Sequence, residues 1–225
     1  METKIREIKR IAEKELACSA HDMEHVMRVY NMAMKIAEKE KNVDHEILKA
    51  AALLHDIART KEDDDKTGRI CHAEESAKMC EPILKKLGFP AEKIKKIKHC
   101  ILSHRYKNDK KPESIEAKIL FDSDKLDSLG AMVIIRAGMW MGRHNCSPFP
   151  KMSLRKYAKR NLVGGKLNGR IKDPSLHNIF YEHEIKDKKL PGLMHTKTAR
   201  RIAKKRLNFS SMFLERLRKE ARGIL

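Results

Sequence analysis

Apolar residues recur at intervals of three and four along most of this chain of 225 residues, a spacing that places them on one face only if the chain is helical. Two clear cases run from Met23 to Glu40 and from Asp44 to Ile57, with Asn42 and Asp44 as candidate capping residues between them. Further helices are expected over 72–87, 91–104, 114–138 and 196–222. Alternating β-branched runs, which strands require, are missing. The sequence therefore predicts an all-α fold.

Two polar or irregular segments divide this pattern. The run 60–69 is expected to be a loop. The Gly, Asn, Ser and Pro residues of 138–150 mark either an active-site loop or the start of a carboxy-terminal part. We therefore expect a helical core over 1–140 and a basic helical region over 141–225 that packs on it as one structural unit.

Basic residues are concentrated late in the chain. Lys and Arg number 50 against 31 Asp and Glu, and residues 151–225 alone contain 21 basic and 6 acidic side chains. Such a region attracts phosphates on nucleotides, nucleic acid or anionic lipid. Lysine-rich helices are often no more than solvated faces, so nucleic acid is the less favoured partner.

Other features of the composition bear on location and cofactors. No stretch approaches the roughly 20 apolar residues that span a bilayer, and the first ten residues carry charges every few positions. We therefore expect no signal peptide, no membrane association and a cytoplasmic location. The five cysteines lack C-x-x-C spacing, which argues against a structural zinc site. Walker and dinucleotide-binding glycine motifs are absent as well.

Polar side chains on apolar helix faces are the informative positions, because burying them costs free energy unless a partner compensates. His25 is in line with Val29, and His21 lies one turn earlier. His55 follows the apolar run AALL, with Asp56 beside it. Each alone could be a hydrogen-bonded core residue. Two imidazoles together with carboxylates form a mixed N/O set that suits Mn, Fe, Ni, Co or Zn.

A distal carboxylate lies in the most apolar predicted helix. Asp124 is in line with Ala117 and Leu120, and Asp122 is in line with Ile119, so spacing alone does not choose between Asp122 and Asp124 as a ligand.

The order H, HD, D in the stretches AHDMEHVMRVY, AALLHDIAR and ILFDSDKLDSLGA resembles the HD superfamily of metal-dependent phosphohydrolases. The CHAEES and SHRY segments and the stretch HNIFYEHEIKDKKLPGLMHTKTARRIAKKRLNF resemble its bacterial and archaeal nucleotide pyrophosphohydrolase-like subfamily, so the similarity spans most of the chain. This resemblance implies an HD helical bundle with additional carboxy-terminal helices.

The resemblance also implies a set of site residues. The metal ligands would be His25, His55, Asp56 and Asp124, which favours Asp124 over Asp122. The ion would be divalent, with Mn, Ni, Co, Fe, Zn and Mg all open. Some HD proteins use further histidines, and the corresponding candidates for a second metal or a phosphate are His72 and His104.

The implied chemistry is hydrolysis of a phosphoester or phosphoanhydride bond, most simply in a nucleoside or deoxynucleoside triphosphate, by a metal-activated water. Candidate catalytic residues are Asp56, Lys125 and Glu74. Candidate substrate-binding residues are His21, Arg59, Arg105 and Lys107. The alternative function is a basic nucleic-acid-binding protein on an HD scaffold that keeps a structural metal.

Overall fold

The computed structural model describes residues 2–16, 23–65, 67, 69–105 and 110–224. These residues are largely helical, and the one β-type pairing among them is an isolated bridge between Leu162 and Ile171. The predicted all-α fold class is confirmed. The chain forms two compact units, Met1–Lys125 and Leu126–Leu225. The division into a helical core over 1–140 and a basic region over 141–225 stays a prediction. Across the described ranges, every helix is too short or too polar to cross a membrane.

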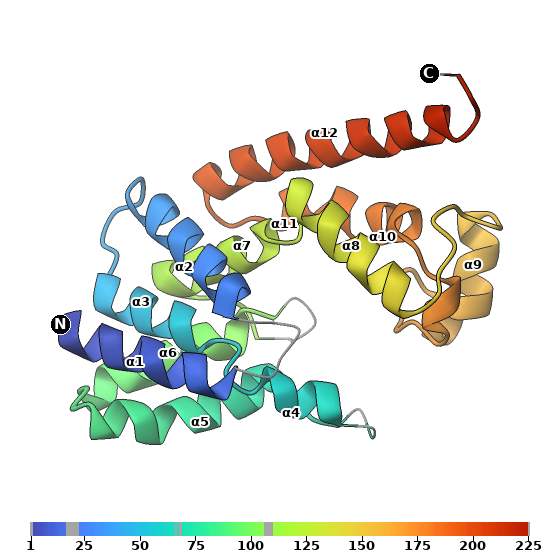
Figure 1. The fold of residues 1–225 in the computed structure, drawn as a ribbon. Coiled ribbons are helices and arrows are strands. Elements are labelled where there is room, and N and C mark those ends of the chain that lie inside the picture. Colours follow the sequence, from blue (N-terminus) through green and yellow to red (C-terminus); the bar gives the residue numbers. More distant parts are fainter. Residues whose placement is uncertain (1, 17–22, 66, 68, 106–109, 225) are drawn as a thin grey trace. The chain divides into compact units, whose positions relative to one another are not determined.

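The described part of the first unit contains seven helices, most of them packed side by side (Figure 1). They are α1 (Glu2–Glu15), α2 (Met23–Ala37), α3 (His45–Leu54), α4 (Arg59–Asp64), α5 (His72–Lys86), α6 (Ala91–Ser103) and α7 (Ile115–Leu126). Helix α3 contacts α1, α2 and α6, and α5 packs along α6. The core of this unit is therefore arranged around α3.

Helix α3 is central because it is apolar on nearly every side. Seven of its ten residues are buried, among them a run of three alanines at 50–52 that offers little bulk to its neighbours. Its amino terminus is capped as predicted, since the Asp44 carboxylate accepts hydrogen bonds from the backbone N–H groups of Glu46 and Ile47. The Asp44 N–H in turn donates to Glu116 of α7 at 2.8 Å, which anchors α7 beside this end of α3.

Two expectations about the helices were wrong. The polar run 60–69 is not entirely a loop, because its first residues belong to the short helix α4 (Arg59–Asp64). The long helix predicted over 114–138 is broken: α7 ends at Leu126 and α8 (Ala131–Arg143) starts after Gly130. Gly130 has φ +79°, a conformation that favours glycine and interrupts a helix even where the apolar pattern continues. Residues 138–143, which we expected to mark either an active-site loop or the start of a carboxy-terminal part, belong to α8.

The second unit contains α8, α9 (Leu154–Asn161), α10 (Ile179–Ile185), α11 (Leu190–Leu193) and α12 (Lys197–Glu220), with short 3-10 turns between them. One apolar cluster joins Tyr157, Ala158 and Leu162 to Tyr181 of α10. A second joins α10 to Leu214 of α12. The apolar stretch in α8 is largely not buried, since Val133 is its buried residue and Met139 is 73% exposed.

A partly buried polar network accompanies the first cluster. The hydroxyl of Tyr157 lies 2.6 Å from Nδ1 of His177, and Nε2 of His177 lies 3.3 Å from the Glu182 carboxylate, which also accepts from Lys186 at 2.9 Å. Burial alone would raise the pKa of Glu182, but Lys186 and His177 outweigh it and lower that pKa to about 2. The network therefore depends on an ionised Glu182.

Glu182→Gln should lower the free energy of unfolding at pH 7 by about 1–3 kcal/mol, because a partly buried hydrogen-bond network loses the negative charge that pairs with Lys186. The folded-state pKa lies below the ordinary value of 4.5, so this stabilisation is present above pH 4.5 and is lost as the pH falls toward 2. Denaturant unfolding at pH 7 and pH 3 should show the gap closing at the lower pH. Glu184→Gln, which removes a more exposed ion pair with Lys188, should change stability little.

Candidate metal centre

His55 stands just past the last residue of α3 and presents a buried nitrogen lone pair. Its Nδ1–H donates to the carbonyl oxygen of Ala52 at 2.8 Å, and its side chain is fully buried. This hydrogen bond leaves Nε2 without the proton in the neutral ring, and Nε2 has no hydrogen-bond partner. A buried, unsatisfied nitrogen is costly unless a ligand occupies the space in front of it.

His72 and His104 repeat this arrangement from α5 and from the end of α6. Nδ1 of His104 donates to the carbonyl oxygen of Ile101 at 2.6 Å. Nδ1 of His72 donates to the Glu62 carboxylate at 2.6 Å. The two Nε2 atoms then face each other at 3.2 Å, and they lie 3.2 and 3.6 Å from Oδ1 of Asp56. The lone pairs of these three atoms repel one another unless a proton or a cation lies between them.

His25 and Asp124 complete the cluster from α2 and α7. Nε2 of His25 lies 3.5 Å from Oδ1 of Asp124 and 3.8 Å from Oδ2 of Asp56. The other oxygen of Asp124 accepts from Lys125 at 2.6 Å. The structure therefore brings all four predicted ligands together.

The ligand atoms form two overlapping groups that share Asp56. In the first group, one donor atom each from His25, His55 and Asp56 lies within 4.8 Å of the others, and the second group does the same with Asp56, His72 and His104. Imidazole nitrogens with carboxylate oxygens suit a first-row divalent transition metal. Asp56 directs Oδ2 toward His25 and His55 and Oδ1 toward His72 and His104, so it would supply a donor to an ion held by either group.

The protonation states match those that a metal requires. Burial lowers the pKa of both His55 and His72 to about 4, which keeps the rings neutral at neutral pH. Burial would raise the pKa of Asp56, but the neighbouring His55 and His104 hold it well below the ordinary value. For Asp124, Lys125 and His25 likewise outweigh burial and keep the pKa low. The neutral rings of His55 and His72 thus lie beside ionised carboxylates, as metal binding requires.

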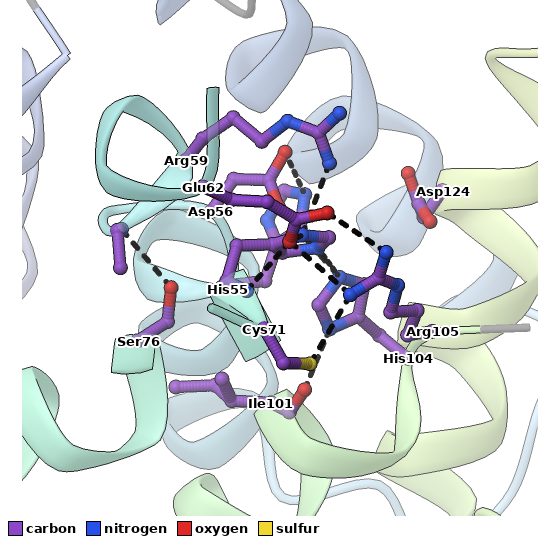
Figure 2. Close-up of polar contacts among 12 residues, drawn as sticks. His55, Asp56, Arg59, Glu62, Cys71, Ser76, Ile101, His104, Arg105 and Asp124 are labelled. Atoms are coloured by element: carbon purple, nitrogen blue, oxygen red, sulfur yellow. Dashed lines mark hydrogen bonds and ion pairs between the residues drawn. The ribbon is translucent and has the colours of Figure 1, made fainter. Parts of the chain in front are cut away.

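Glu62 is a site residue that sequence analysis missed. It accepts from the backbone N–H of His72 at 2.7 Å and from its ring. It also forms a two-pronged ion pair with Arg105, at 2.8 and 3.1 Å (Figure 2). A carboxylate behind a ligand histidine sets the orientation and the proton position of the ring. The acidic run EDDD after the HD doublet was the available signal, but four adjacent acids gave no basis for choosing one.

The predicted cations near the centre are paired with carboxylates. Arg105 pairs with Glu62, Lys125 with Asp124, and Arg59 with Asp63 at 3.3 Å. Arg59 also lies 3.0 Å from the ring of His72.

Other predicted site residues lie elsewhere. Glu74 is exposed on the first turn of α5, and its catalytic role stays a prediction. Asp122 is fully buried, whereas Asp124 is the one that lies beside His25. His21 and Lys107 fall outside the described residues.

Comparison with known proteins identifies relatives of the whole chain. A model of the HD domain family matches residues 22–129. The uncharacterized protein YpgQ of Bacillus subtilis strain 168 is 32% identical over 210 residues, which cover 92% of this chain and 87% of the relative. The crystal structure of Bacillus subtilis YpgQ in complex with ADP superposes with a TM-score of 0.67 and 27% identity, covering 99% of this chain and 97% of that one.

A third relative is an HD-superfamily hydrolase from Bacillus thuringiensis, whose crystal structure superposes with a TM-score of 0.71 and 29% identity over 98% of each chain. The similarity therefore extends through both compact units and well past the segment that matches the family model.

His55→Ala should weaken binding of Mn²⁺ or Co²⁺ by more than about 100-fold, because it removes a donor atom from the centre. Glu62→Gln should weaken binding of the same ions by about 10- to 100-fold, because the His72 ring is no longer held in its orientation. Titration calorimetry and elemental analysis after dialysis measure both effects. His99→Ala is the matched control, since the His99 ring instead accepts from the backbone N–H of Glu113. Unchanged metal binding in His55→Ala would contradict the assignment.

Proposed function

Since the chain belongs to the HD domain family, whose characterised members are metal-dependent phosphohydrolases, we propose that it hydrolyses a phosphoester or phosphoanhydride bond at the Asp56 centre. The observation that carries this proposal is the convergence of imidazole Nε2 atoms from four helical segments on one buried, ionised carboxylate. Without a cation this arrangement would be strongly unfavourable.

In the proposed site His25, His55, Asp56 and Asp124 would hold the principal metal ion, and His72 and His104 would supply further donors near Oδ1 of Asp56. A bound divalent metal supplies Lewis acidity and lowers the pKa of water toward neutrality. Asp56 orients the attacking water, because both its oxygens lie among the donor atoms. Burial of the cluster excludes bulk water and strengthens its electrostatic interactions.

The charge that develops on the phosphoryl group requires nearby cations. Arg59, Arg105 and Lys125 are the described candidates, and each is already oriented by a carboxylate. Lys125 is the nearest to the metal ligands, since it contacts Asp124 directly. We assign phosphate binding to these three side chains and keep His21 and Lys107 as further candidates.

We infer that the substrate is a nucleotide, with a nucleoside or deoxynucleoside triphosphate as the leading class and either pyrophosphohydrolase or phosphodiesterase chemistry. The support is the relative YpgQ, which was crystallised with ADP and is similar over almost the whole of both chains. The three candidate cations fit a polyphosphate, which carries several negative charges.

A phosphate and pyrophosphate release screen over nucleotides with Mn²⁺, Co²⁺, Ni²⁺ or Mg²⁺ tests the function. Asp56→Asn and Asp124→Ala should each reduce kcat by about 1000-fold or more, because catalysis by the metal-activated water requires both ligands. Circular dichroism establishes that each variant is folded. Turnover that persists in folded Asp56→Asn would exclude the proposed centre.

The same screen decides the role of Glu74. Loss of a general base in Glu74→Gln would cost about 100-fold or more in kcat. A smaller change would leave Glu74 as an exposed residue without a catalytic role.

A further inference from the structure

The longest stretch without acidic residues lies in the second unit. Residues 128–172 contain ten Lys or Arg and not one Asp or Glu. Eight of the ten fall in 151–172, which form α9 and the loop that follows it. Within the described residues, none of these eight cations forms an ion pair with a carboxylate. This segment therefore has an excess of positive charge that the described carboxylates leave uncompensated.

The cations of α9 share one face of the helix. Arg155, Lys156, Lys159 and Arg160 are all exposed. At 100° per residue they fall within about 140° of the helix circumference. The opposite face is buried and includes Tyr157. The helix is thus fixed to the second unit by its apolar side and presents four positive charges outward.

The loop after α9 is closed by backbone hydrogen bonds. The N–H of Val163 donates to the carbonyl of Arg170, and the N–H of Lys172 to that of Asn161, both at 2.9 Å. A side chain at Gly169 would place its Cβ 2.2 Å from the carbonyl oxygen of Val163, so this closure requires glycine. The loop therefore has a defined shape.

The same loop lies against α9. A Cβ at Gly165 would be 3.7 Å from the Cα of Lys159, and Nζ of Lys172 donates to the carbonyl of Arg160 at 3.4 Å. The loop therefore adds its own cations beside those of the helix. We call the combined set the α9 basic surface; it comprises Arg155, Lys156, Lys159, Arg160, Lys166, Arg170 and Lys172.

We propose that the α9 basic surface binds the phosphate backbone of a nucleic-acid duplex. A duplex carries closely spaced phosphates, and unpaired Lys and Arg side chains gain affinity by releasing the counterions around them. Contacts of this kind position a protein without reading bases. No residue of this surface belongs to the metal centre, so the inference is independent of the proposed function.

Two other partners fit the observations less well. A helix that lies in a membrane buries its apolar face in lipid, but the apolar face of α9 is already packed against Tyr181. A single-strand binder stacks bases on exposed aromatic rings, but Tyr157, the aromatic residue of this segment, is fully buried. The outward face offers mainly charge, which is what a duplex backbone requires.

Fluorescence anisotropy with 20-bp DNA and RNA duplexes between 50 and 200 mM salt tests the proposal on the full chain. The variant Arg155→Gln, Lys156→Gln, Lys159→Gln, Arg160→Gln should bind at least about tenfold more weakly and reduce the slope of log K against log salt by about 3 to 4, roughly 0.9 for each lost phosphate contact. Thermal melting establishes that the variant is folded, since all four side chains are exposed.

The matched control removes the same charge from the first unit. Lys14, Lys35, Lys39 and Lys41 are exposed. Changing all four to Gln lowers the net charge by the same amount, and it should leave duplex affinity within about twofold of that of the parent protein. Equal losses in both variants would overturn the proposal in favour of non-specific attraction. Tighter binding to single strands or to phosphatidylserine vesicles than to duplexes would overturn it as well.

Discussion

The geometry of the first unit depends on the mutual placement of one carboxylate and several imidazole nitrogens. Asp56 and His55 are both buried, and two donor atoms of the cluster, Nε2 of His55 and Oδ1 of Asp56, make no hydrogen bonds. Unsatisfied buried groups of this kind normally destabilise a fold. Because these groups are concentrated in one cluster, the metal-free unit is less stable than it would be if they were paired. The same arrangement keeps the donor atoms oriented for a metal.

Helix periodicity and polar positions on apolar faces were enough to predict the all-α class and to single out the residues that the structure brings together. His25, His55 and Asp124 stood out because burial of a polar side chain contradicts the surrounding pattern. The choice between Asp122 and Asp124 came from resemblance alone, since both lie on buried sides of α7. The helical spacing does not distinguish the two aspartates, because nearly every side of this helix is buried.

The structural features that we could not predict leave no trace in the helical spacing of apolar residues. Glu62 lies on α4, a six-residue helix with no buried residue, so no apolar stripe marked the helix or the direction of its side chains. The break at Gly130 depends on a single backbone angle in a stretch whose apolar residues continue on both sides. The place of Glu62 in the site is set by a tertiary contact, its ion pair with Arg105, which joins residues distant in sequence.

The positions of His55 and His104 at helix ends have an electrostatic consequence. Each occupies the C-cap of its helix, α3 or α6, and each donates Nδ1–H to a carbonyl of the last turn. The carboxy-terminal ends of helices carry partial negative charge, roughly half an elementary charge each. Each of these two ends therefore adds a negative potential beside its own ring, which no side-chain substitution removes.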